Sequence, residues 1–76
     1  MINYKDNIIS DYKIMLGKPV IKGTRITVEL ILKKLSEGIT IPQLIEMYPH
    51  LNSEQIHAAL EYASNVVGNE EVLELA

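Results

Sequence analysis

The chain contains no Cys, Phe or Trp, and four Tyr are its only members of the Phe, Trp and Tyr group. Without cysteine it can form neither a disulfide scaffold nor a thiolate zinc site. The longest aliphatic run is Leu30-Ile31-Leu32, whereas a membrane-spanning helix needs about 20 apolar residues. The first ten residues also lack the apolar stretch typical of a signal peptide. We therefore expect a soluble, cytoplasmic protein with no membrane partner.

Positive charge is missing from the second half of the sequence. Residues 12–34 hold six Lys and Arg against one Glu, a net charge of +5. Residues 35–76 hold seven Glu and no Lys or Arg, a net charge of −7. This asymmetry gives one segment that suits phosphate and another that repels it.

Apolar residues make up 47% of the 76 residues, which is enough for one small globular domain. In residues 1–26, Ile8-Ile9 and Pro19-Val20-Ile21 are short apolar runs separated by turn residues. Proline suits the first position of a strand because it has no N–H to donate. We therefore predict a β-hairpin or arm over residues 1–26.

Helical spacing of apolar residues begins after the hairpin, in three stretches of residues 28–35, 41–48 and 56–67. The predicted N-caps are Thr27, Thr40 and Asn52, the last two with Gln three residues later. The predicted helix ends are Gly38, Pro49 and Gly68. The predicted fold is mainly α in a single domain over residues 1–76. It consists of the hairpin, a three-helix, helix-turn-helix-like core over residues 27–68, and a short helical tail over residues 69–76.

Residues 17–26, with the sequence GKPVIKGTRI, closely resemble the opening signature of the family called domain of unknown function 433. The resemblance continues through Glu37-Gly38 and Tyr48-Pro49-His50-Leu51 and covers about residues 8–67. The chain departs from the family pattern at Tyr12, where Pro is frequent, and at Leu16, where Gly is frequent. The resemblance implies a helix-turn-helix-like domain of prokaryotic antitoxins, often encoded beside a PIN-like ribonuclease toxin. We therefore expect a type II antitoxin that binds this toxin directly. The basic segment favours binding to operator DNA as well, and the small core and isolated hairpin favour a homodimer, because a symmetric partner covers strand edges and stray apolar surface.

Two groups of residues are candidates for DNA binding. The cations of the basic segment are suited to phosphate, and polar side chains around the start of the third helix are of types that read base edges. The candidate residues are Lys18, Lys22, Arg25, Lys33, Lys34, Asn52, Ser53, Gln55 and His57. Alternatively, Arg25 pairs with a carboxylate that holds the arm on the helices, and the polar face of the third helix, which also carries Glu54 and Glu61, is only solvated.

The C-terminal tail is the candidate partner-binding segment. It places three aliphatic residues among three carboxylates, and these residues are Val72, Leu73 and Leu75. We expect the aliphatic residues to fill a groove on the toxin while the carboxylates meet basic residues around its RNA-binding cleft. The alternative is that the tail folds back on its own subunit or on its dimer mate.

Catalytic and metal chemistry find little support in the sequence. Glu54 and His57 have the Glu-x-x-His spacing of di-iron bundles, but such sites need a second copy of the motif, and His50 is the only other histidine. No nucleophile with a partnered base and no phosphate-binding loop is present. We expect neither an enzyme nor a bound metal or cofactor. Besides the antitoxin hypothesis, a protein-interaction or dimerisation module of helix-turn-helix shape without DNA binding stays open.

Overall fold

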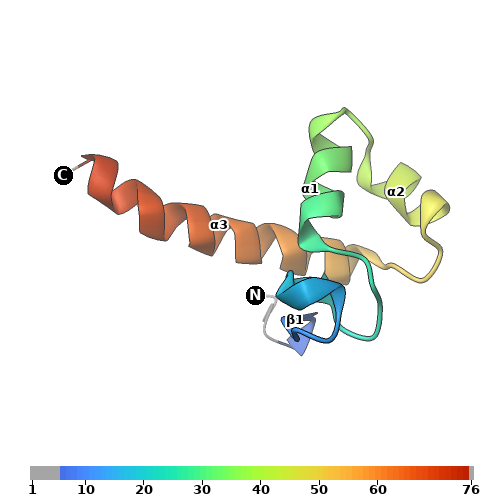
Figure 1. Cartoon of the computed structure of the whole chain (residues 1–76). Helices are drawn as coiled ribbons and strands as arrows, with labels where there is room; N and C mark the ends of the chain where they lie inside the picture. The colour runs from blue at the N-terminus through green and yellow to red at the C-terminus, as the bar shows by residue number, and fades with distance from the viewer. Residues whose placement is uncertain (1–5, 76) are drawn as a thin grey trace.

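The computed structural model describes the backbone of residues 6–75 and the side chains of residues 6–68. The described elements are β1 (Ile8–Ile9), η2 (Met15–Gly17), β2 (Val20–Ile21), α1 (Val28–Ser36), α2 (Ile41–Met47) and α3 (Ser53–Leu75). In Figure 1, α1 and α2 lie on one side of the N-terminal half of α3 and the hairpin lies on the other, while the C-terminal half extends away. The mainly helical fold with an N-terminal hairpin is confirmed.

The two strands form the predicted antiparallel hairpin. Ile8 pairs with Ile21 and Ile9 with Val20. Both β2 residues are fully buried, because this strand lies between β1 and a third extended segment. That segment comes just before α1 and forms an antiparallel bridge between Val20 and Thr27, so β2 is hydrogen-bonded on both edges. The second pairing ties the hairpin directly to the first helix.

The connection between β1 and β2 contains a left-handed turn. Three consecutive residues have positive φ angles, which are 52° at Met15, 57° at Leu16 and 86° at Gly17. Glycine adopts this conformation freely, but other L-residues lose about 1–2 kcal/mol each. Leu16 therefore occupies a strained position with a side chain that is 75% exposed, at the place where the resembled family often has Gly.

All three predicted N-caps are confirmed. The Thr27 hydroxyl accepts a hydrogen bond from the Leu30 N–H at 3.0 Å, which satisfies one of the free donors in the first turn of α1. At α2, the Thr40 side chain accepts from the Gln43 N–H while the Gln43 side chain accepts from the Thr40 N–H. These caps explain why short helices with few internal hydrogen bonds begin at definite residues.

The hydrophobic core lies where α1, α2 and the hairpin meet the N-terminal half of α3. Two alanines of α3, Ala58 and Ala59, are completely buried, and their small size lets neighbouring elements approach the helix closely. Leu51 is also buried, in the α2–α3 turn. The largest fully buried side chains are Val20, Ile21, Ile31, Leu44 and Ile56.

The predicted end of the third helix at Gly68 is wrong. Helix α3 continues through this residue to Leu75, and Gly68 does not have the positive φ of a helix stop, unlike Gly38 with 94°. Glycine inside a helix costs about 1 kcal/mol relative to Ala, which the flanking residues can offset. Two apolar residues of the predicted 56–67 stripe are also exposed, Leu60 at 37% and Val67 at 58%.

Candidate functional site

The signature segment forms a tightly hydrogen-bonded turn between β2 and α1. The Ile21 N–H donates to the Ile26 carbonyl at 2.9 Å and closes the turn at its base. Inside the turn, the Thr24 hydroxyl donates to the Ile21 carbonyl at 2.8 Å and accepts from the Ile26 N–H at 3.0 Å. Gly23 provides the positive φ of 82° that this path needs. The turn therefore has a fixed shape before any partner binds.

Two candidate cations, Lys22 and Arg25, are exposed on this turn. Within the described residues neither forms an ion pair, so the interpretation of Arg25 as a clamp paired with a carboxylate finds no support there. Arg25 also lines a shallow depression with Ile14 and Thr24. The turn thus presents two uncompensated positive charges on a rigid backbone, which suits phosphate or an acidic protein surface.

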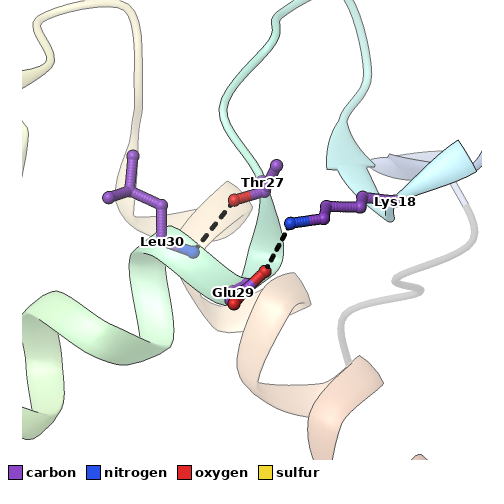
Figure 2. A network of polar contacts seen from close by, with 4 residues as sticks. All are labelled: Lys18, Thr27, Glu29 and Leu30. Atoms are coloured by element: carbon purple, nitrogen blue, oxygen red, sulfur yellow. Dashed lines mark hydrogen bonds and ion pairs between the residues drawn. The ribbon is translucent and has the colours of Figure 1, made fainter. Parts of the chain in front are cut away.

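The remaining candidate cations lie around α1 and are largely compensated. Lys18 Nζ lies 3.1 Å from Glu29 Oε1 of α1. Figure 2 shows this pair beside the Thr27 cap of α1. Lys33 lies 3.9 Å from the Glu37 carboxylate one turn later. All four charged groups are at least 47% exposed, and exposed pairs contribute at most about 1 kcal/mol to stability. Lys34 has no such partner among the described residues.

The polar candidates at the start of α3 divide into capping and exposed residues. The Asn52 side chain accepts from the Gln55 N–H at 2.8 Å, and the Gln55 side chain accepts from the Asn52 N–H at 2.9 Å. Each side-chain oxygen therefore already accepts one hydrogen bond in the reciprocal cap, which fixes the orientation of both amides, while the cap does not involve their N–H donors. Ser53 and His57 are exposed, with Glu54 between them in sequence. A carboxylate in the first turn repels phosphate and compensates the positive end of the helix dipole.

The structure does not bring all of the candidate residues together. Lys18 and Lys33 line one open depression along α1. Lys22 and Arg25 share the signature turn, while the polar α3 residues begin after the α2–α3 connection. Among the described residues, no group of three or more His, Asp or Glu is placed to hold a metal ion. The described helices also include none that is long and apolar enough to cross a membrane.

The predicted partner-binding side chains, Val72, Leu73 and Leu75, lie outside the residues whose side chains are described. Sequence reasoning did, however, miss the exposed apolar residues that come before them on α3. Val66 is 41% exposed and Val67 is 58% exposed. The exposure of Val66 and Val67 follows from the length of α3. Because the helix continues past Gly68, its apolar stripe extends beyond the body.

Comparison with known proteins assigns the family. The model of the family described as "Protein of unknown function (DUF433)" matches residues 8–63. The chain belongs to this family. The DUF433 match spans the hairpin, α1, α2 and the first half of α3, and it ends close to where α3 leaves the body. The signature turn, the three helix caps and the α2–α3 connection therefore all lie within the matched residues.

Among curated proteins, this DUF433 chain is similar to the uncharacterized protein y4eO of Sinorhizobium fredii (strain NBRC 101917 / NGR234). The two are 30% identical over 59 residues, which is 78% of this chain and 27% of the relative. The chain thus spans about a quarter of the length of that relative. No solved structure matches the chain.

Proposed function

We propose that this DUF433 chain is the antitoxin of a type II toxin–antitoxin system and neutralises a PIN-like ribonuclease toxin by direct binding. The carrying observation is that α3 runs to Leu75 while the family match ends at residue 63. The helix therefore extends beyond the body as a projecting element (Figure 1). Amphipathic helices that project in this way are a recurrent means of filling a groove on a partner.

The sequence of the extension supports a basic partner surface. Residues 69–76 contain Glu70, Glu71 and Glu74 and no Lys or Arg. A ribonuclease carries basic residues where it binds the RNA backbone, so an acidic helix complements that cleft electrostatically. Neutralisation would then consist of covering the cleft, and it requires no catalysis by this chain.

The test is a growth assay with the acidic-cluster nuclease encoded in the neighbouring reading frame. We expect the full chain to rescue growth and the chain truncated after Gly68 to fail, with little change in its thermal midpoint. If the truncated protein still neutralises, the toxin does not bind the extension. If the full chain does not relieve toxicity, or no such neighbour exists, the antitoxin proposal fails.

Two triple variants test whether toxin binding depends on the negative charge of residues 69–76 or only on their presence. One variant neutralises the extension and is Glu70→Gln, Glu71→Gln, Glu74→Gln. Its control removes the same charge from the rest of the chain and is Glu37→Gln, Glu46→Gln, Glu54→Gln. We expect the first variant to weaken toxin binding about tenfold or more, since charged contacts contribute about 1.5–3 kcal/mol each at best, and the control to bind normally.

Operator binding as a dimer is the second part of the proposal, and the signature turn supports it. Lys22 and Arg25 are exposed and uncompensated there within the described residues, in the segment of net charge +5. Phosphate contacts are blind to sequence. Lys22→Ala and Arg25→Ala should therefore weaken binding to every DNA and each reduce the salt slope by about 1.

The control for this experiment is Arg25→Lys, which keeps the charge and should keep the salt slope. The alternative function is a protein-interaction module without DNA activity. Absence of a gel shift with its own promoter at low salt, with and without the toxin, would favour that alternative.

A further inference from the structure

The connection between β1 and β2 contains a tight turn at residues 11–14, which we call the hairpin tip. The Ile14 N–H donates to the Asp11 carbonyl at 2.7 Å, and the Lys13 N–H donates to the Asp11 carboxylate at 2.9 Å. Tyr12 and Lys13 are therefore the two central residues of the turn. Tyr12 is 77% exposed, the highest value among the exposed large hydrophobic side chains of the described residues. The tip thus presents an aromatic ring to solvent on a backbone held by hydrogen bonds.

The chain that returns from the tip is also held in a fixed shape. The Gly17 N–H donates to the Ile14 carbonyl at 3.1 Å, and the Lys18 N–H donates to the Met15 carbonyl at 3.2 Å. These bonds close the left-handed turn that contains the strained, exposed Leu16. Strained non-glycine residues concentrate at functional sites, where a particular loop shape is needed. The strain therefore indicates a loop whose shape serves binding.

A shallow depression joins the hairpin tip to the signature turn. Its volume is about 450 Å³, and it is lined by Ile14 of the tip and by Gly23, Thr24 and Arg25 of the signature turn. The N–H groups of Gly23 and Arg25 donate no hydrogen bond within the described residues, so they are available to an acceptor. Tyr12 comes two residues before Ile14, so the Cα atoms of the two residues are at most about 7 Å apart. An anion in the depression would therefore lie close to the tip that carries the exposed ring.

The cations around this depression lack acidic partners. Lys13, Lys22 and Arg25 form no ion pair within the described residues. The acidic residue of the tip is Asp11, whose carboxylate already accepts the Lys13 N–H. Residues 11–14 and 22–25 together carry three positive charges and one negative charge, a net charge of +2. An exposed aromatic ring beside uncompensated cations is the combination by which proteins hold single-stranded nucleic acid.

We propose that the hairpin tip and the signature turn together bind single-stranded nucleic acid. One unpaired base stacks on the Tyr12 ring, and the neighbouring phosphates contact Lys13, Lys22 and Arg25. A phosphate oxygen in the depression accepts hydrogen bonds from the Arg25 guanidinium and from the free N–H groups of the turn. Every base has a face that can stack, so the site accepts strands of differing sequence.

Base pairing distinguishes a single strand from a duplex at this site. In a duplex each base is already stacked between its neighbours, so the Tyr12 ring has no free base face to cover. The proposed operator contact uses Lys22 and Arg25 through phosphates alone, whereas single-strand binding also requires Tyr12. The inference goes beyond the proposed function, because it adds a class of ligand and requires neither a toxin nor a dimer. Tyr12 variants therefore test it without testing operator binding.

Fluorescence anisotropy with labelled oligouridine, oligothymidine and a DNA duplex tests the proposal. Strands of about 12 nucleotides fall within the range of about 4–16 nucleotides that such sites occupy. We expect the wild type to bind both single strands, and Tyr12→Ala to weaken this binding about tenfold while duplex binding is unchanged. Tyr12→Phe keeps the ring and should bind both strands normally. The matched control is Met47→Ala, which truncates an exposed residue of α2 and should alter neither activity.

An abasic strand gives a second measurement that uses the wild-type chain. This strand keeps the phosphates of oligothymidine but lacks its bases, so the wild type should bind it about tenfold more weakly than oligothymidine. Because Tyr12→Ala has no ring to stack, it should bind the two strands about equally. An unchanged affinity of Tyr12→Ala for the single strands, or equal binding of abasic and intact strands by the wild type, would overturn the proposal. No binding of either single strand would also overturn it and leave an acidic protein surface as the ligand of these cations.

Discussion

Replacing Gly68 with alanine distinguishes a continuous α3 from a helix that ends at this glycine. In the structure Gly68 is inside α3 and does not have a positive φ. A Cβ built there meets no atom of the described residues within 4 Å, apart from its chain neighbours and the backbone of its own helix. Alanine in a helix interior is more stable than glycine by about 0.8–1 kcal/mol. If Gly68 were instead a left-handed helix stop, alanine would cost about 1–2 kcal/mol. The two structures therefore predict opposite signs.

Urea unfolding followed by circular dichroism at 222 nm provides the measurement. Gly68→Ala should raise the helix signal and increase the free energy of unfolding by up to about 1 kcal/mol. In a domain of this size that corresponds to about 4–8 °C in Tm. The free energy of unfolding increases by the full amount only if residues 69–75 unfold together with the body. The circular dichroism signal at 222 nm rises whether or not they do.

Gly38→Ala is the matched control. A Cβ at Gly38 also meets no atom within 4 Å, but its φ is 94°, so only the backbone conformation differs in kind between the two sites. Gly38→Ala should lower the free energy of unfolding by about 1–2 kcal/mol. Reduced stability and unchanged helicity in Gly68→Ala would refute the continuous helix and restore the stop that the sequence predicts.

Three further substitutions test local features, each by the shift in urea midpoint. Thr24→Val removes a hydroxyl that bridges two backbone groups of the signature turn and should cost about 1–3 kcal/mol. Gln55→Ala removes one half of the reciprocal cap with Asn52 and should cost about 0.5–1 kcal/mol, whether or not DNA binding changes. Leu16→Gly relieves a φ of 57° at an exposed side chain and should stabilise the fold by about 0.5–1 kcal/mol, after the entropy that glycine adds to the unfolded chain.

The helix starts could be predicted because their chemistry is local. A hydroxyl or amide at the cap and a glutamine three residues later interact within one turn, whatever the rest of the chain does. Thr40 with Gln43 and Asn52 with Gln55 form these reciprocal bonds in the structure. The hairpin could be predicted for a similar reason, since its two apolar runs are bounded by turn residues.

The extent of burial could not be predicted in this way because it depends on where the body ends. The stripe on α3 has uniform helical spacing, yet Ile56 is completely buried and Val67 is 58% exposed. Spacing defines a face of a helix, but only neighbouring elements decide how much of that face is covered. The bridge between Val20 and Thr27 was missed because a single pair of residues leaves no periodic pattern.

For the candidate site, too, residue types could be predicted from the sequence, whereas the contacts of their side chains depend on the tertiary fold. The sequence indicates cations and polar side chains of suitable type, but not which of them are already engaged. Lys18 and Lys33 have carboxylate partners, while Lys22 and Arg25 have none among the described residues. Among the described residues, the candidate cations without an ion pair are thus Lys22 and Arg25 on the signature turn and Lys34 on α1.

The contacts at the start of α3 affect how selectively the chain could bind DNA. The side-chain oxygens of Asn52 and Gln55 each already accept one hydrogen bond in the cap, and the Glu54 carboxylate, which repels phosphate, lies in the first turn of the helix that would enter a major groove. DNA contacts would then depend mainly on phosphates, which give affinity and little sequence preference. Selectivity must come instead from the spacing of two such surfaces in a dimer, or from a protein partner.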